Sequence, residues 1–248
     1  KVNVFLVGPA GAGKTTVAKQ VAHSLGLRFH FNGAIHSEYK LTGFRDAQGK
    51  VHRTACREAF EHGGVYLFDE IDASQPAALL AFNAALANGM FDFPDRNVQA
   101  HPNFRCIAAA NTWGKGATMD YVGRNALDAA TMDRFAMLEM RYDASLERRM
   151  AHLASNDHID LAEAWLELVQ KTRALCHEHD FRHIVSPRAT QQGLRLMVGG
   201  ITAEGATLMV LRRGMEDTSW GRIHPSIHAL IQKAEAARQH VVSITQKP

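Results

Sequence analysis

The residues with the clearest chemistry lie near the start of the chain, from Gly8 to Thr16. Gly8, four further residues and then Gly13-Lys14-Thr15 have the spacing of a phosphate-binding loop. Gly11 and Gly13 permit backbone conformations in which successive N–H groups point at phosphate oxygens. Lys14 is placed to reach the β- and γ-phosphates of ATP, and the Thr15 hydroxyl to ligate Mg²⁺. The alternative is a glycine-rich turn that binds nothing. The predicted nucleotide-binding residues are Gly8, Pro9, Ala10, Gly11, Ala12, Gly13, Lys14, Thr15 and Thr16.

Two adjacent acids, Asp69 and Glu70, follow the apolar stretch Val65–Phe68. If that stretch is a strand parallel to the one before the loop, Asp69 lies beside a Mg²⁺ held by Thr15. Thr15 and Asp69 are therefore the predicted metal ligands. Glu70 is placed to align and deprotonate an attacking water, which makes it a predicted catalytic residue. The alternative is a strand end with two solvated acids. Asp72 nearby is expected to be a surface acid, with a local hydrogen bond or a contact to a neighbouring subunit as the alternatives.

A third apolar stretch, 105–110, ends at Asn111. At the end of a parallel strand its amide is placed to contact the γ-phosphate or the lytic water. A polar residue that closes a strand is ordinary by itself. Because two strands with matching loops precede it, we predict that Asn111 is a catalytic sensor residue.

These side chains need a scaffold that brings separate strand ends together. Residues 2–7 are nearly all apolar, as in a central parallel strand covered on both faces. Strand and helix patterns then alternate with short connections to about residue 143, which predicts an α/β fold with a parallel sheet and helices on both faces. Residues 39–53 and 90–104 are each predicted to hold a β-hairpin.

Beyond this region only helical patterns remain. We predict a nucleotide-binding α/β domain over 1–143 and a small all-helical domain over 144–248. Within the second, apolar residues at helical spacing predict helices over 161–175, 202–213 and 225–241, and a further one opening at Ser186-Pro187.

The composition indicates the cellular location and the kinds of partner more clearly than it indicates the reaction. The net charge of +3 over 248 residues does not indicate nucleic acid as a partner, although it does not exclude it. Three cysteines lie far apart with no Cys-x-x-Cys spacing, which favours a reduced, cytoplasmic location. No apolar run approaches membrane-spanning length, so no membrane partner is expected. The chain opens on Lys1 directly before a core strand, which leads us to expect a longer protein.

Five stretches of the sequence are informative together. They are Gly8-Pro9-x-Gly11-x-Gly13-Lys14-Thr15, Phe68-Asp69-Glu70-x-Asp72, His101-Pro102-x-Phe104-Arg105 running into Ala110-Asn111-Thr112, Met132-Asp133-Arg134-Phe135 and Ser186-Pro187-Arg188. The first two are the Walker A and Walker B motifs, which many ATPases share, and the last three are more specific. Taken together, the five stretches resemble the AAA+ ATPases of the MoxR branch, nearest to the ATPase subunit of aerobic cobaltochelatase (the CobS type) and related stand-alone ATPases of phages and bacteria. The resemblance implies a P-loop AAA+ core followed by a helical lid domain.

The resemblance also implies roles for arginines. Arg134 matches the arginine finger, which reaches into the ATP site of the next subunit. The alternative for Arg134 is a surface salt bridge with Asp128 or Asp133. Arg188 matches the sensor 2 arginine of the lid, which acts in cis, or it is a plain helix-start residue. Arg124 is a candidate for a second contact in trans.

The function that the resemblance implies is an ATP hydrolase that assembles with its own copies, as a hexameric ring, and remodels a protein client or adaptor. The hairpins then line the pore or face the partner, with Tyr39, Lys40 and Phe44 as possible pore contacts. Three alternatives remain open: the ATPase subunit of a cobalt chelatase complex, a DNA-linked phage motor, and a P-loop metabolite kinase.

Overall fold

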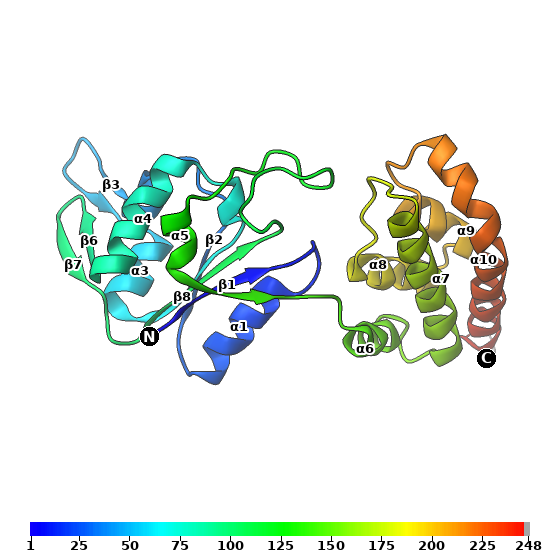
Figure 1. Cartoon of the computed structure of the whole chain (residues 1–248). Helices are drawn as coiled ribbons and strands as arrows, with labels where there is room; N and C mark the ends of the chain where they lie inside the picture. Colours follow the sequence, from blue (N-terminus) through cyan, green and yellow to red (C-terminus); the bar gives the residue numbers. More distant parts are fainter. Residues whose placement is uncertain (246–248) are drawn as a thin grey trace. The chain divides into compact units, whose positions relative to one another are not determined.

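A computed structural model of the chain describes residues 1–245 and divides into two compact units (Figure 1). The sheet unit comprises residues 1–9 and 13–141. The helical unit comprises residues 10–12 and the chain from Tyr142 onward. Each unit has its own hydrophobic core.

A five-stranded parallel sheet forms the centre of the sheet unit, with the strand order β2-β5-β8-β1-β9. The register aligns Val7 at the end of β1 with Ala110 of β8 and with Glu139 of β9. The carboxyl ends of these strands therefore meet at one edge, and the predicted parallel sheet is confirmed. The strands are β1 (Asn3–Val7), β2 (Phe29–Asn32), β5 (Gly64–Phe68), β8 (Phe104–Ala110) and β9 (Phe135–Glu139).

Alternate side chains of the strands pack on opposite faces of this sheet, as the pleat requires. Leu6 of β1 belongs to the core cluster that contains residues of α1 (Lys14–Ser24). The next strand residue toward the amino end, Phe5, belongs to the cluster that contains residues of α3 (Ala55–His62) and α4 (Pro76–Asn88). Helices thus cover both faces, as predicted.

Two antiparallel hairpins interrupt the alternation of strand and helix. The first joins β3 (Phe44–Arg45) to β4 (Val51–His52), and the second joins β6 (Met90–Phe93) to β7 (Arg96–Gln99). The first hairpin is shorter than the predicted segment 39–53, because Tyr39–Thr42 form a helical turn, α2. Packing explains the helical turn, because it buries Leu41 completely in the core.

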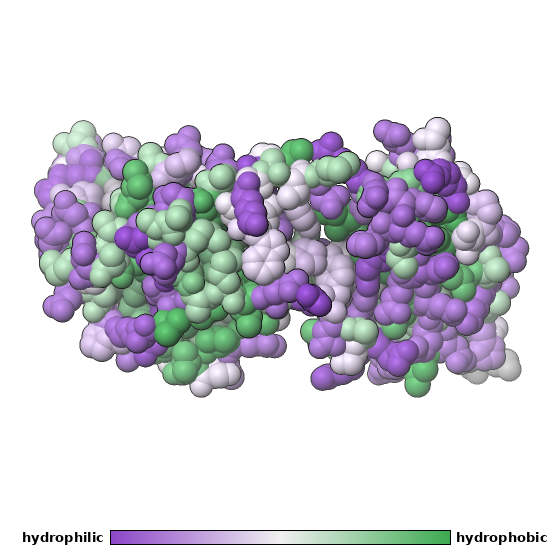
Figure 2. All heavy atoms as spheres, in the orientation of Figure 1, coloured by the Kyte–Doolittle hydropathy of each residue, from purple (hydrophilic) through white to green (hydrophobic). Residues whose placement is uncertain are grey.

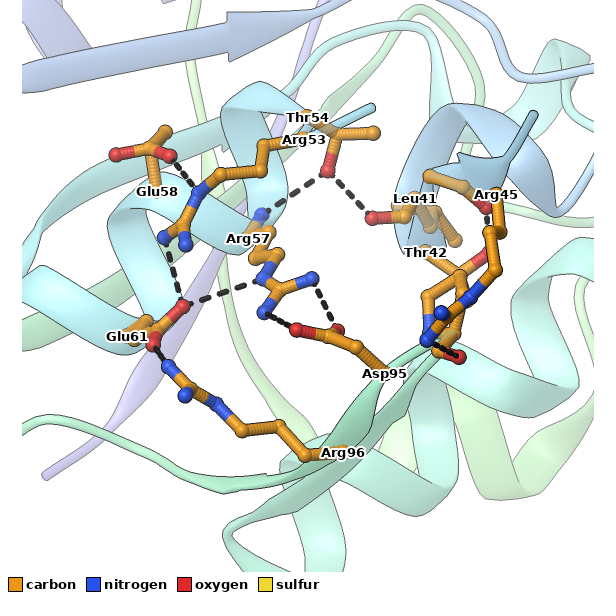
Figure 3. A network of polar contacts seen from close by, with 12 residues as sticks. Leu41, Thr42, Arg45, Arg53, Thr54, Arg57, Glu58, Glu61, Asp95 and Arg96 are labelled. Carbon is orange, nitrogen blue, oxygen red and sulfur yellow. Dashed lines mark hydrogen bonds and ion pairs between the residues drawn. The ribbon is translucent and has the colours of Figure 1, made fainter. Parts of the chain in front are cut away.

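A network of charged side chains holds the second hairpin on α3 (Figure 3). Arg57 of α3, with only 1% of its side chain exposed, donates two hydrogen bonds to Asp95 in the hairpin turn, at 2.6 and 2.8 Å. Glu61 accepts from Arg57 at 3.2 Å and also pairs with Arg96. We call Arg53, Arg57, Glu58, Glu61, Asp95 and Arg96 the hairpin network.

The outer face of α4 differs from the usual solvated helix surface because the helix contains no charged residue. Leu80 on this face is 63% exposed, and Ala77, Ala84 and Ala87 are exposed beside it. Figure 2 shows apolar side chains gathered over the region of α4 and α5 (Ala129–Asp133). A surface of this kind favours contact with another protein surface.

The helical unit packs around Trp165, which is fully buried in α7. A Cβ at Gly193 of α8 would lie 2.0 Å from the Trp165 ring, so only glycine permits this approach. The last helix begins at Asp217 rather than at Pro225, because Trp220 and Ile223 before the proline are buried in this core. The elements are α6 (Ala144–Ala154), α7 (Ile159–Glu178), α8 (Pro187–Val198), α9 (Ala203–Ala206), the π-helical turn η2 (Thr207–Leu211) and α10 (Asp217–Thr245).

None of the helices in residues 1–245 is both long and apolar enough to cross a lipid bilayer. Cys56, Cys106 and Cys176 are free and buried. Burial raises the pKa of the Cys176 thiol to about 11. Burial also raises the pKa of the Cys56 and Cys106 thiols, so all three are poor candidates for nucleophilic chemistry.

Candidate nucleotide-binding site

The predicted phosphate loop leaves the carboxyl end of β1 and runs into the first turn of α1. Gly11 and Gly13 have φ angles of 81° and 89°, in the left-handed region that favours glycine. Gly8 is constrained in another way, since a Cβ there would lie 2.0 Å from the carbonyl oxygen of Met140. The loop therefore needs glycine at each of these three positions, for conformation or for space.

Lys14 lies at the centre of the site with only 7% of the residue exposed. Its Nζ donates to the carbonyl oxygens of Gly8 and Pro9, at 2.7 and 3.0 Å. It also donates to Oδ1 of Asn111 at 2.8 Å. Asn111 follows the carboxyl end of β8, the strand next to β1, so the structure brings these two predicted residues into contact.

Thr15 and Asp69 form the second predicted contact. The Thr15 hydroxyl donates to Oδ2 of Asp69 at 2.8 Å. A hydroxyl and a carboxylate side by side suit Mg²⁺, which takes one or two protein oxygens and completes its shell with phosphate and water. In the described residues no group of three or more histidines, cysteines, aspartates or glutamates is arranged to hold a metal. The donor set thus fits Mg²⁺ bound together with a phosphate ligand.

Glu70 stands at a sharp turn directly after β5. Its φ is 53°, and its N–H donates to Oδ1 of Asp69 at 3.0 Å. The Glu70 side chain is 49% exposed, and its Oε1 accepts from Nη2 of Arg124 at 3.3 Å. Glu70 is therefore the acid at this strand end that stays open to solvent.

Asp72 contradicts its prediction as a surface acid, because it is fully buried. The left-handed turn at Glu70 leads into the short helix η1 (Ile71–Ala73), which directs Ile71 and Asp72 into the protein. Oδ2 of Asp72 accepts from the Thr112 N–H at 3.2 Å and from its hydroxyl at 2.7 Å. Oδ1 pairs with Nη1 of Arg124 at 3.2 Å.

Arg134 lies at the amino ends of the strands, whereas the phosphate loop lies at their carboxyl ends. It directly precedes β9, whose first residue pairs with Asn3 at the start of β1. Since β1 has five residues, Arg134 and the loop are separated by about 16 Å of strand. Arg134 forms no ion pair with Asp128 or Asp133 in the described residues; Nε donates to the carbonyl of Asn83 at 3.1 Å, and Nη1 donates to that of Ala130.

Arg188 occupies the first turn of α8 in the helical unit. Ser186 caps this helix by accepting the Arg188 N–H at 3.3 Å. The cap explains why a helix begins at Ser186-Pro187, as predicted. The role of Arg188 as a sensor stays a prediction from the resemblance.

Comparison with known families identifies the class of protein. Residues 3–135 match the AAA domain of the dynein-related subfamily, and the chain belongs to this family. The match covers the strands β1, β2, β5 and β8, the phosphate loop and the paired acids Asp69 and Glu70. The chain is thus a member of the AAA+ class.

Particular relatives are distant. An uncharacterized protein of Staphylococcus epidermidis is 27% identical over 158 residues, which are 56% of this chain and 56% of that protein. The chain therefore spans about half the length of this curated relative. NtrX of Brucella abortus in complex with ADP is similar over 96% of this chain and 58% of its own, with a TM-score of 0.59 and 15% identity.

The RuvB Holliday junction branch migration motor of Thermotoga maritima is similar over 91% of this chain and 61% of its own. The TM-score is 0.53 and the identity 17%. At such identities the likeness to NtrX and RuvB supports the fold alone.

Proposed function

We propose that this chain binds ATP with Mg²⁺ and hydrolyses it at the carboxyl edge of its parallel sheet. The observation that carries the proposal is the convergence of Lys14, Thr15, Asp69 and Asn111 through two direct hydrogen bonds of 2.8 Å, with Glu70 next to Asp69. These residues come from three different strand ends. Their types match what phosphoryl transfer to water needs: a cation, a metal-ligand pair, an amide and a general base.

Each residue has a specific task in this proposal. Lys14 and the loop N–H groups hold the β- and γ-phosphates, and Thr15 and Asp69 hold Mg²⁺. The metal, when bound, neutralises charge on the phosphate oxygens. Glu70 takes a proton from the attacking water, and its exposed carboxylate is accessible for that step. Asn111 orients the γ-phosphate or the water.

We further propose that Arg134 completes the site of a neighbouring copy. Its place at the amino edge of the sheet puts it out of reach of its own phosphate loop. Arg134 also contacts α4, since its Nε donates to the Asn83 carbonyl, and the outer face of that helix carries no charged residue. Both features favour contact between copies on this side of the sheet unit. A homo-oligomeric ring, proposed as a hexamer, supplies such a contact.

The type of AAA+ ATPase that we propose follows from the resemblance of the sequence motifs to the MoxR branch. A MoxR-type ATPase that remodels a protein client, or a cobalt chelatase ATPase subunit, agrees with family membership and with the two hairpins of the sheet unit. A metabolite kinase is disfavoured, because a kinase needs no acid in the position of Glu70 to activate water. Strongly salt-dependent DNA binding would instead favour the DNA-linked motor.

Turnover of ATP by wild-type, Lys14→Ala and Glu70→Gln chains tests the proposal, together with binding of a fluorescent ATP analogue. We expect Lys14→Ala to lose binding, and Glu70→Gln to bind but hydrolyse poorly. Size-exclusion chromatography with ATP should give a hexamer-sized species. A wild-type chain that binds ATP but stays monomeric and transfers phosphate to a small metabolite would support the kinase. Capture of proteins on ATP-loaded Glu70→Gln then identifies the client.

A further inference from the structure

Arg124 makes contacts that the proposed catalytic steps do not use. Its guanidinium forks between two acids of the same chain, Asp72 at 3.2 Å and Glu70 at 3.3 Å. The Arg124 side chain is 12% exposed and that of Asp72 is fully buried, whereas that of Glu70 is 49% exposed. The cluster is therefore closed around Asp72 and open only at Glu70.

Asp72, which pairs with Arg124, is itself held in place by several hydrogen bonds. Its second carboxylate oxygen accepts two hydrogen bonds from Thr112, and its carbonyl accepts the Asn125 N–H at 2.6 Å. Asn125 is tied down again, since its side chain donates to the Ser74 carbonyl at 2.9 Å. A buried carboxylate that loses its charged partner is strongly destabilised, so Asp72 holds Arg124 in place.

The same contacts join Glu70 to the phosphate loop. Thr112 directly follows Asn111, and Asn111 accepts from Lys14. A continuous path thus runs from Lys14 through Asn111, Thr112 and Asp72 to Arg124. Glu70 lies at its end.

We propose that Arg124 is a positioning residue that acts in cis: anchored by Asp72, it orients the carboxylate of Glu70 in its own subunit. The inference rests on the proposed ATP hydrolysis and adds the group that fixes the general base. It replaces the expected role of Arg124 as a second contact in trans. Reaching a neighbour's nucleotide would require the Arg124 guanidinium to leave both acids.

Mixing Arg124→Ala with Lys14→Ala subunits separates the two roles. If Arg124 acts in cis, the Arg124→Ala subunit spoils its own site, and mixing it with Lys14→Ala subunits gives no recovery of ATP turnover. If Arg124 acts in trans, the Lys14→Ala subunits supply it and turnover recovers, which would overturn the inference. Mixtures of Arg134→Ala with Lys14→Ala provide the positive control, since that arginine is proposed to act in trans.

Alone, Arg124→Ala should lower turnover by about tenfold to a hundredfold, as expected when a catalytic group is misplaced by about 1 Å. The dissociation constant for a fluorescent ATP analogue should stay unchanged. Arg124→Lys should restore part of the turnover, because it keeps the charge but loses the fork. Lys115→Ala removes an exposed charge from the same loop and should leave turnover unchanged.

A double variant at Arg124 and Glu70 gives the decisive measurement, because it shows whether the two side chains act together. In the Glu70→Gln background, adding Arg124→Ala should cause no further loss, since residues that act as one unit are not additive. Independent, additive losses, or a weakened nucleotide affinity, would mean a merely structural role and would overturn the inference. Failure of the proposed function is distinguishable, because the wild-type chain would then show no turnover at all.

Discussion

Two arginines of the sheet unit, Arg57 and Arg124, have the same local chemistry and very different surroundings. Each pairs with two acids of its own chain. Glu61, which pairs with Arg57, is only 10% exposed, and the cluster joins a helix to a hairpin turn (Figure 3). Glu70, which pairs with Arg124, is 49% exposed and stands at a strand end beside the phosphate loop.

The difference shows what decides the role of an ion pair in this fold. Where the arginine itself is buried, as Arg57 is, and its acids belong to separate elements, the pair fixes those elements relative to each other. Where one acid stays open to solvent beside a phosphate loop, the pair leaves a carboxylate free to take a proton. The hairpin network should therefore determine stability, and the Arg124 cluster should determine turnover.

The largest expected effect comes from replacing Glu70, the solvent-exposed acid beside the phosphate loop. Glu70→Gln should lower ATP turnover by about 10²–10⁴, the usual contribution of a general base, while the affinity for ATP stays intact. Phosphate release and binding of a fluorescent ATP analogue measure the two quantities. Glu38→Gln, an exposed acid outside the site, is the matched control. Equal turnover in the two variants would remove Glu70 from the mechanism.

Breaking the hairpin network should lower the stability of the protein and leave its ATP turnover unchanged. Arg57→Ala removes a side chain that is only 1% exposed, together with its hydrogen bonds to Asp95 and Glu61, and should lower the free energy of unfolding by about 2 kcal/mol. The protein that remains folded should keep its turnover. Urea unfolding followed by circular dichroism tests this, with exposed Lys50→Ala as control. A loss below about 1 kcal/mol, typical of surface pairs, would contradict the account of the hairpin network.

A smaller effect is expected at the start of the helix that carries Arg57. The Thr54 hydroxyl accepts the Arg57 N–H at 3.1 Å and donates to the Leu41 carbonyl at 2.6 Å. Thr54→Ala should therefore cost about 1 kcal/mol of unfolding free energy, the usual value for a lost helix cap. Thr54→Ser keeps the cap and should stay close to the wild type. Equal losses in both variants would instead implicate the methyl group.

The smallest effect is a pH dependence of the hairpin network. Hydrogen bonding to Arg57 lowers the pKa of Asp95 from its ordinary value of 3.8 to about 2. Because the pKa is lower in the folded chain, this pair stabilises the fold above pH 3.8, and the stabilisation disappears as pH falls to about 2. The difference in unfolding free energy between wild type and Asp95→Asn should shrink over that range. A constant difference would contradict the ion pair.

Local signals in the sequence were sufficient to predict the sheet and the phosphate loop. Apolar runs define buried parallel strands, and the glycines around Lys14 satisfy a conformational need that does not depend on distant residues. The strand ends then bring Asp69 and Asn111 to the loop, because parallel strands share a carboxyl edge.

The sequence failed where the outcome depends on packing. Asp72 is buried because the left-handed turn at Glu70 directs the following residues inward, and a run of acids after a strand does not reveal that turn. The predicted start of the last helix at Pro225 is wrong, because the helix α10 already includes the buried Trp220 before this proline. The helical turn at Tyr39–Thr42 likewise replaced part of a predicted hairpin.

The most direct test of the central claim asks whether a neighbour completes the ATP site. Arg134→Ala and Lys14→Ala subunits, each inactive alone, are mixed at several ratios and ATP turnover is measured. The account predicts that turnover appears in the mixture, because some sites combine an intact Lys14 with an Arg134 from the next subunit. Full turnover by Arg134→Ala alone, or a mixture as inactive as its parts, would contradict it.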